Sequence, residues 1–279
     1  MDVRGYLERI GYRGQVAPTL DCLAEVHRCH ALTIPYENLD IQLGRPVSHR
    51  IEDVFDKLVR RRRGGWCYEM NGLLCWGLRE IGFEVLRATG GIHRRERGDT
   101  AMGNHLVLLV NLDRRTYVAD LGLGDGMRLP LPLAEGEHTQ CELTFRVEAL
   151  EGGIWRIFNH SFGYPTDYDL RVEEADEFQL RDYAEQLQTS PDSVFVQNLD
   201  CELMTDNAIT CLTGRVLRKK SASGTLRRLI GSADEMHAVL RETFGIFGVD
   251  LAPVWPLICD RHQVLFGDQP FDQTEDLDI

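Results

Sequence analysis

The segment RGGWCYEMNGLL, residues 63–74, places a cysteine between a pair of glycines and an expected helix. Apolar residues then recur at three- and four-residue spacing, and Gly82 ends the pattern, which predicts a helix beginning near Cys67. The unpaired N–H groups and positive dipole end of a helix N-terminus favour thiolate over thiol. Because the thiolate is the nucleophilic form, we expect Cys67 to be reactive.

The composition is that of an acidic chain with ordinary apolar content. Of its 279 residues, 43% are hydrophobic, and the formal net charge is −13. This charge argues against nucleic acid or an anionic membrane as a partner, since both need clustered positive charge. No apolar run suits a transmembrane helix and the N-terminus lacks a signal-peptide pattern, so we expect a cytoplasmic protein.

The eight cysteines are spread along the chain without a Cys-x-x-Cys pair. In a cytosolic protein this distribution predicts free, mostly buried thiols rather than disulfides. His27, Cys29 and His30 lie close together, but no second ligand cluster accompanies them at metal spacing. We therefore expect no metal site.

Three regions differ in their patterns, and together they predict an α+β fold. Residues 1–84 read as a helical bundle that carries Cys67, with helices over 3–10, 19–31 and 51–59. Residues 85–190 read as an antiparallel sheet or barrel, with strands over 83–89, 105–110, 116–121, 142–150 and 154–158, followed by a helix over 175–188. Residues 191–279 read as a mixed α/β region, with strands over 201–203 and 208–217, a helix over 232–244 and an acidic tail after Gly267.

A cysteine nucleophile usually needs an imidazole base and an acceptor that orients the imidazole. His105 opens one expected strand, and Asp120 closes the next. If Val110 pairs with Tyr117 in a hairpin, His105 and Asp120 become diagonal neighbours on one face. The apolar neighbours of Asp120 argue against a surface carboxylate there, while a purely structural His105 stays an alternative.

Two segments are candidates for holding phosphate groups on this acidic chain. The turn GLGDG, residues 122–126, has three alternate glycines that allow close backbone approach to a ligand. The stretch 208–233 contains six basic residues and no acidic residue. This stretch is either a solvated basic hairpin or a patch that binds a phosphorylated ligand.

Residues 63–71 resemble the Arg-Gly-Gly-x-Cys-x-Glu-x-Asn signature of the arylamine N-acetyltransferases. Four further segments resemble the same family, in order and at similar spacing: IPYENLD at 34–40, HL at 105–106 with DLGLG at 120–124, TSPDSVF at 189–195, and LTGR at 212–215. The resemblance runs from about residue 5 to residue 250. It implies a helical bundle, an antiparallel β-barrel and an α/β lid around a cysteine-protease-like catalytic core.

The resemblance also implies an acetyl transfer from acetyl-CoA to an arylamine, arylhydrazine or arylhydroxylamine through an acetyl-cysteine. Cys67 would accept the acetyl group, His105 would pair with it, and Asp120 would orient the imidazole. Arg63, Glu37 and Asn38 would form a supporting network beneath the cysteine loop. We expect the acceptor to contact Leu123, Tyr36 and Tyr68, and coenzyme A to contact Gly103, Gly124, Gly126 and Thr213.

One departure from the family concerns the acceptor, because Leu123 stands where the family usually has phenylalanine and so cannot stack on a ring. The scaffold also resembles amide synthases that use the same three residues with a carrier-bound acyl chain. Cysteine chemistry of this kind further permits a papain-like hydrolase. An inactive scaffold that binds a partner is the fourth reading.

Overall fold

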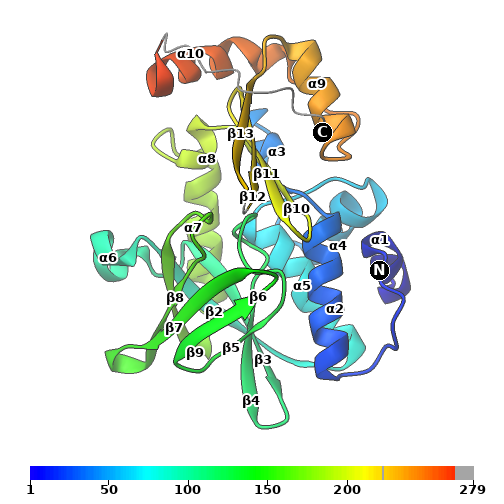
Figure 1. Ribbon diagram of the computed structural model, residues 1–279, viewed down its shortest axis with the longest axis vertical. Helices are drawn as coiled ribbons and strands as arrows, with labels where there is room; N and C mark the ends of the chain where they lie inside the picture. Colours follow the sequence, from blue (N-terminus) through cyan, green and yellow to red (C-terminus); the bar gives the residue numbers. More distant parts are fainter. Residues whose placement is uncertain (222, 268–279) are drawn as a thin grey trace.

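The computed structural model describes residues 1–221 and 223–267 (Figure 1). Its N-terminal part is helical: α1 (Val3–Ile10), α2 (Leu20–Thr33), α3 (Leu39–Gln42), α4 (Ile51–Phe55), a π-helical turn (Asp56–Arg60) and α5 (Cys67–Ile81). Asp2 and Thr19 cap α1 and α2 by accepting hydrogen bonds from backbone N–H groups. The predicted helices of this region are confirmed. Cys67 is the first residue of α5, and Gly82 ends it in a left-handed conformation.

The central part is an eight-stranded antiparallel sheet that curls into a nearly closed barrel. Its order is β5 (Leu131–Pro132), β4 (Arg115–Ala119), β3 (His105–Leu112), β2 (Glu84–Ile92), β9 (Asp167–Glu174), β8 (Ile154–Phe158), β7 (Leu143–Ala149) and β6 (Gly136–Gln140). The predicted pairing of Val110 with Tyr117 is confirmed. Sequence analysis missed β5, β6 and β9: β5 has two residues and β6 is polar, whereas Tyr168, Leu170 and Val172 of β9 do alternate with polar residues. The same part holds the short turns α6 (Arg94–Arg97), Gly98–Ala101 and Glu151–Gly153.

A second antiparallel sheet joins segments from both ends of the chain. Its order is β1 (Tyr36–Glu37), β10 (Asp200–Met204), β11 (Ala208–Thr213), β12 (Val216–Ser221) and β13 (Gly224–Leu229). The single strand expected over 208–217 is wrong, because Gly214 turns the chain with φ 56° and separates β11 from β12. The basic stretch is thus mostly the β11–β12–β13 meander.

Four helices and a short turn complete the described part of the chain: α7 (Glu177–Thr189), α8 (Val194–Gln197), α9 (Ala233–Glu242), Ala252–Val254 and α10 (Trp255–Phe266). In Figure 1, α9 and α10 lie at one end of the molecule and the barrel lies at the other. Sequence analysis did not predict α10. The acidic tail expected after Gly267 lies outside the described residues.

Three hydrophobic cores hold these parts together. The largest surrounds α5, whose Leu73, Leu74 and Leu78 are fully buried, and it reaches strands of both sheets. A second lies between α9 and one face of the second sheet, and a third lies within the barrel. Burial of α5 on nearly every side fixes the position of its N-terminal residue, Cys67.

Candidate active site

Cys67 lies at the N-terminus of α5 and is 2% exposed. The preceding loop is pinned to β1, because Gly65 accepts a hydrogen bond from Glu37 N at 3.0 Å. Gly64 passes so close to this segment that an added Cβ would lie 2.1 Å from the Pro35 oxygen. The glycine pair therefore allows the tight approach that holds the cysteine in place.

His105 and Asp120 lie at one end of the β3–β4 hairpin and are fully buried there. His105 Nε2 lies 2.8 Å from Asp120 Oδ2. The other carboxylate oxygen, Oδ1, accepts hydrogen bonds from Asn71 Nδ2 and Gly122 N, both at 2.8 Å. Burial opposes ionisation of Asp120, but the charge and hydrogen bond of His105, with these donors, hold the pKa of the carboxyl below its usual value.

Cys67 and His105 meet beside Gly122. A Cβ added to this glycine would lie 2.7 Å from His105 Cε1 and 2.8 Å from Cys67 Cβ. His105 Nδ1 is buried and has no hydrogen-bond partner among the residues described. The imidazole thus binds Asp120 through one nitrogen and keeps the other free for a reacting group.

Asn71 is a residue of this site to which sequence reasoning gave no role. It lies one helical turn after Cys67 on α5, so both side chains project from the same side of the helix. Its Nδ2 donates to the Leu106 oxygen at 2.6 Å as well as to Asp120, and its Oδ1 accepts from Leu121 N at 2.8 Å. One amide therefore fixes α5 against both strands that carry His105 and Asp120.

Tyr168 on β9 also borders the site without a sequence signal. Its ring packs edge-on against the His105 imidazole, with the ring centroids 5.4 Å apart. Burial, together with the nearby Asp120 carboxylate, raises the pKa of the Tyr168 phenol well above its ordinary value. The phenol therefore stays neutral and shields the imidazole from water.

The ionisation of Cys67 differs from the expectation based on its helix position alone. Burial raises the pKa of the Cys67 thiol, and the Asp120 carboxylate raises it further. The backbone N–H groups of Tyr68 and Cys67 act in the opposite direction, as expected at a helix N-terminus, but their effect is the smaller one. A thiolate at this position consequently needs a base that takes its proton, and His105 is adjacent.

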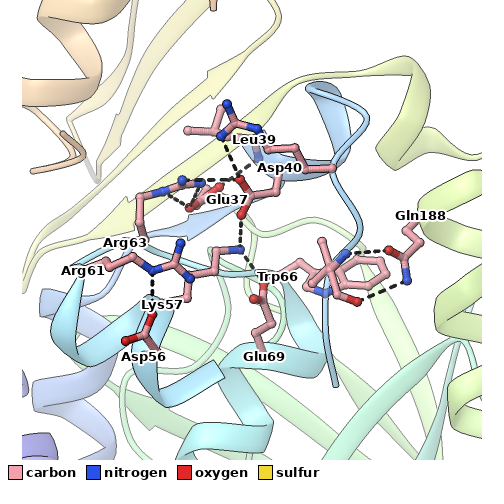
Figure 2. Close-up of polar contacts among 12 residues, drawn as sticks. Glu37, Leu39, Asp40, Asp56, Lys57, Arg61, Arg63, Trp66, Glu69 and Gln188 are labelled. Carbon is pink, nitrogen blue, oxygen red and sulfur yellow. Dashed lines mark hydrogen bonds and ion pairs between the residues drawn. The ribbon is translucent and has the colours of Figure 1, made fainter. Parts of the chain in front are cut away.

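A buried network of charges supports the loop before Cys67 (Figure 2). Arg63 Nη2 lies 2.7 Å from Glu37 Oε1, and Lys57 Nζ lies 2.9 Å from Glu69 Oε2 and 3.0 Å from Asp40 Oδ2. The resemblance placed Asn38 in this network. Instead, Asn38 donates to the Phe195 and Asn198 oxygens and accepts from Asp200 N, so it ties the loop to the second sheet.

A cavity of about 470 Å³ opens at Cys67. Helical, barrel and second-sheet segments all line it, and its wall includes Tyr36, Gly122 and Leu123 near the cysteine, with Arg97, Arg218 and Lys220 among its charged groups. The arrangement offers a buried sulfur, an adjacent base and room for a substrate. This is what acyl transfer through a cysteine requires.

The chain also matches known proteins in sequence and in fold. Residues 19–251 match the N-acetyltransferase family. The chain is 31% identical to human arylamine N-acetyltransferase 1 over 277 residues, covering 88% of this chain and 94% of the human one.

The chain belongs to the arylamine N-acetyltransferase family. The M. tuberculosis arylamine N-acetyltransferase structure superposes with a TM-score of 0.83 at 32% identity, covering 92% of this chain and 99% of that one. The Mycobacterium marinum enzyme in complex with CoA gives 0.82 at 31% identity, covering 93% and 98%. These relatives lend no support to the amide-synthase alternative.

In this arylamine N-acetyltransferase family member, some of the residues expected to contact substrates line the cavity at Cys67 and others do not. Leu123, Tyr36 and Thr213 line the cavity at Cys67. Tyr68 lines a separate cavity with Trp76, and its hydroxyl donates to the Gly103 oxygen at 2.9 Å. Tyr68 thus faces away from the expected acceptor.

Each glycine that was expected to contact coenzyme A lies close to a side chain of the protein itself. A Cβ on Gly103 would lie 2.6 Å from the Tyr183 ring on α7, and one on Gly126 would lie 3.3 Å from Leu123. Gly124, with φ 73°, leaves room for the Glu202 carboxylate. None of the three glycines is among the residues that line the cavity at Cys67.

Two further expectations concern the whole chain. All eight cysteines are free, as expected, although Cys141 is exposed. Over the described residues, no helix is both long enough and apolar enough to cross a bilayer.

Proposed function

We propose that this enzyme transfers an acetyl group from acetyl-CoA to the nitrogen of an arylamine, arylhydrazine or arylhydroxylamine, with Cys67, His105 and Asp120 as its catalytic residues. The geometry around the Cys67 sulfur carries the proposal. The Cys67 side chain and the His105 imidazole meet beside Gly122, His105 Nδ1 has no partner among the described residues, and a cavity of about 470 Å³ leads to the sulfur.

In the first half-reaction, His105 takes the thiol proton and the Cys67 sulfur attacks the acetyl carbonyl carbon. The ionised Asp120 stabilises the imidazolium that forms. A new carbon–sulfur bond forms to Cys67, the bond to the coenzyme sulfur breaks, and His105 returns the proton to the departing thiolate. One thioester replaces another, so the step is close to thermoneutral.

In the second half-reaction, the amine nitrogen attacks the acetyl-cysteine. Aryl amines are weak bases and are unprotonated at neutral pH, so they attack without prior deprotonation. His105 takes the proton from the attacking nitrogen as the tetrahedral intermediate collapses, and Cys67 leaves as a thiolate. The products are the N-acetyl compound and a thiolate–imidazolium pair, and transfer of the proton from His105 to Cys67 restores the starting thiol and neutral imidazole.

The donor's phosphates need positive charge, which is scarce on a chain of net charge −13. Arg97 is exposed and lines the cavity, and Arg218 reaches it from β12. We assign the coenzyme's charged end to these basic groups, and Thr213 to its neutral chain. The same proposal includes catalysis without a metal and a cytoplasmic location. It also divides the chain into three regions, residues 1–84, 85–190 and 191–279.

The proposal is tested by intact-protein mass spectrometry after mixing the enzyme with acetyl-CoA. Wild type should gain the mass of one acetyl group, and Cys67→Ser should not, because a serine hydroxyl is far less acidic and nucleophilic. Cys75→Ser, in the same helix, is the matched control and should acetylate normally. A wild type that gains no acetyl group would contradict the donor assignment.

Two further measurements on the same enzyme test the hydrolase and inactive-scaffold alternatives. Release of acetate from the acetyl-enzyme without any amine would indicate a hydrolase. Failure of Cys67 to react with iodoacetamide at neutral pH would indicate an inactive scaffold.

A further inference from the structure

One wall of the cavity at Cys67 is a polar face of the second sheet. Side chains alternate along each strand, so Cys201, Leu212 and Leu217 pack against the α9 core while their neighbours face the cavity. The facing residues include directly paired positions across three strands, Glu202 with Cys211 and Cys211 with Arg218. This wall therefore places buried ionisable groups where a substrate would bind.

Glu202 is the least satisfied of these groups. Its side chain lines the cavity and the residue is only 9% exposed. No N–H or O–H group of the described residues hydrogen-bonds with its carboxylate, and its one close donor is the weak thiol of Cys211. A Cβ added to Gly124 would lie 2.1 Å from Glu202 Oε2, so the glycine makes room for this carboxylate.

Asp200 and Asp125 lie near Glu202 but have partners of their own. Asp200 Oδ1 accepts a hydrogen bond from Thr213 Oγ1 at 3.2 Å. Asp125 Oδ2 accepts from Tyr164 N at 3.0 Å and lies 3.3 Å from Lys220 Nζ. Lys220 and Arg218 also act on Asp200 and Glu202, so these three carboxyl groups face two cations, and Glu202 has no ion pair of its own.

A buried carboxylate without N–H donors is costly to ionise, and this cost raises its pKa. Burial, with repulsion from Asp125 and Asp200, raises the pKa of Glu202 well above its ordinary value. Burial likewise raises the pKa of Asp200 to about 7. A bound group that supplies N–H donors and positive charge would remove this cost.

We propose that the preferred acceptor carries, besides its reacting amine, a second group that is cationic and donates N–H hydrogen bonds, and that Glu202 and Asp200 bind this group. The inference rests on the proposed acetyl transfer and names its substrate class. Gly65 bridges to Tyr36 and Tyr36 pairs with Glu202, so two strand spacings, about 10 Å, separate the cysteine loop from Glu202. Cys67 and Glu202 line the same cavity, whose volume of about 470 Å³ accommodates one aromatic ring with a substituent.

Other charged or titratable groups also line the cavity. Arg218 and Lys220 approach from β12, and His93 and Arg97 line the barrel side. Asp125, Glu202 and Cys211 also place possible metal-binding atoms within 4.8 Å of one another. However, the Lys220 ammonium at Asp125 repels a second cation there, and an organic group at Glu202 and Asp200 leaves that ion pair intact.

The test compares three acceptors of one shape and different charge: 4-aminobenzamidine, 4-aminobenzamide and 4-aminobenzoate. For each enzyme, the ratio of kcat/KM for the amidine to that for the amide is measured. Differences in amine reactivity are the same in every variant, so the change in this ratio reports binding of the cation. Glu202→Gln should lower the ratio about tenfold or more, because it removes a charge-assisted hydrogen bond.

Asp200→Asn should also lower the ratio of kcat/KM for the amidine to that for the amide. Asp260→Asn, the same chemical change at an exposed position on α10, is the control and should leave it unchanged. Wild type alone gives a second measurement. KM for the amidine should fall as pH rises from 5 to 8, since the carboxyl groups ionise, while KM for the amide should change less.

Unchanged ratios in both variants, or a wild type that prefers the benzoate, would overturn the cation site. Acetylation of Cys67 by acetyl-CoA is measured in the same samples. If acetylation fails in wild type, the proposed function itself is contradicted. If acetylation proceeds and the ratios do not move, only the acceptor inference is wrong.

Discussion

At the scale of single residues, Asp120 is the centre of the proposed catalytic group. It binds His105 through one oxygen and the donors of Asn71 and Gly122 through the other. The pKa of its carboxyl lies below the ordinary value because these partners outweigh the effect of burial. Asp120 therefore stays ionised through neutral pH and stabilises a protonated His105.

Asp120→Asn tests this role. Its Oδ1 would still accept from Asn71 and Gly122, but its amide N–H would face His105 Nε2 and force that nitrogen to accept. The Nδ1 atom would then carry the proton and could not take one from Cys67. We expect the rate of Cys67 acetylation, measured by mass spectrometry in rapid-quench samples, to fall about 1,000-fold or more.

The control for this variant is Asp192→Asn, at an exposed position before α8. It should acetylate at the wild-type rate. A rate for Asp120→Asn within a factor of three of wild type would remove Asp120 from the catalytic group.

Sequence reasoning at this scale proposed Cys67, His105 and Asp120 as a catalytic group, because local patterns mark a helix start and a hairpin, and their catalytic roles stay a prediction. It missed the roles of Asn71 and Tyr168, whose functions depend on segments that are distant in sequence. It also assigned Tyr68 to the acceptor, whereas that side chain lines a different cavity. The direction of one side chain depends on packing that a motif does not describe.

At the scale of elements, the turn after β4 lets the start of α5 and the β3–β4 hairpin approach each other closely. Gly122 lies where the start of α5 meets the β3–β4 hairpin, and its lack of a side chain lets Cys67 and His105 come together. The expectation that the 122–126 glycines approach a coenzyme stays a prediction. The structure gives Gly122 and Gly124 a different role, which is to make room for protein side chains.

Gly122→Ala should separate the cysteine from its base. The added methyl group would lie 2.7–2.8 Å from both residues, so one of them must move. Displacements of about 1 Å at a reacting group cost about 100-fold in rate. We expect at least that loss in Cys67 acetylation with the far-ultraviolet circular dichroism spectrum unchanged.

Gly72→Ala is the matched control within α5, because a Cβ there meets nothing within 4 Å. It should keep wild-type activity and raise the free energy of unfolding by up to about 1 kcal/mol, through higher helix propensity. Equal activity of Gly122→Ala and Gly72→Ala would show that the close approach at residue 122 is unimportant.

At the scale of the whole molecule, two sets of buried ionisable groups respond to pH in opposite directions. Burial lowers the pKa of His27 and of His160 to about 4, so stability is lost as pH falls from the ordinary histidine pKa toward 4. Burial raises the pKa of Asp125 to about 6 and that of Asp200 to about 7, so stability is lost as pH rises toward 7. The cavity wall is therefore a destabilising feature at neutral pH.

Asp200→Asn should remove the free-energy cost of burying a charged carboxylate at this position. The asparagine oxygen still accepts from Thr213, but no charge is buried when pH rises. The gain in unfolding free energy should be small near pH 4 and grow to about 4 kcal/mol at pH 8. Urea unfolding of wild type and variant at both pH values measures it, and an equal gain at both would contradict the raised pKa.

The sequence by itself determined the helix that starts at Cys67, the register of the β3–β4 hairpin and, through its motifs, the family. These features depend on periodicity, turns and neighbouring residues, which a local pattern records. The three-part division into 1–84, 85–190 and 191–279 stays a prediction.

Only the tertiary structure decided what faces Cys67 across the cavity. The second sheet pairs Tyr36 with Glu202, residues far apart in the chain, and so brings buried carboxyl groups to the cysteine. Their raised pKa values, and that of Cys67 itself, come from burial among distant segments. Burial and long-range charge are properties of the assembled fold, so no single stretch of sequence could reveal them.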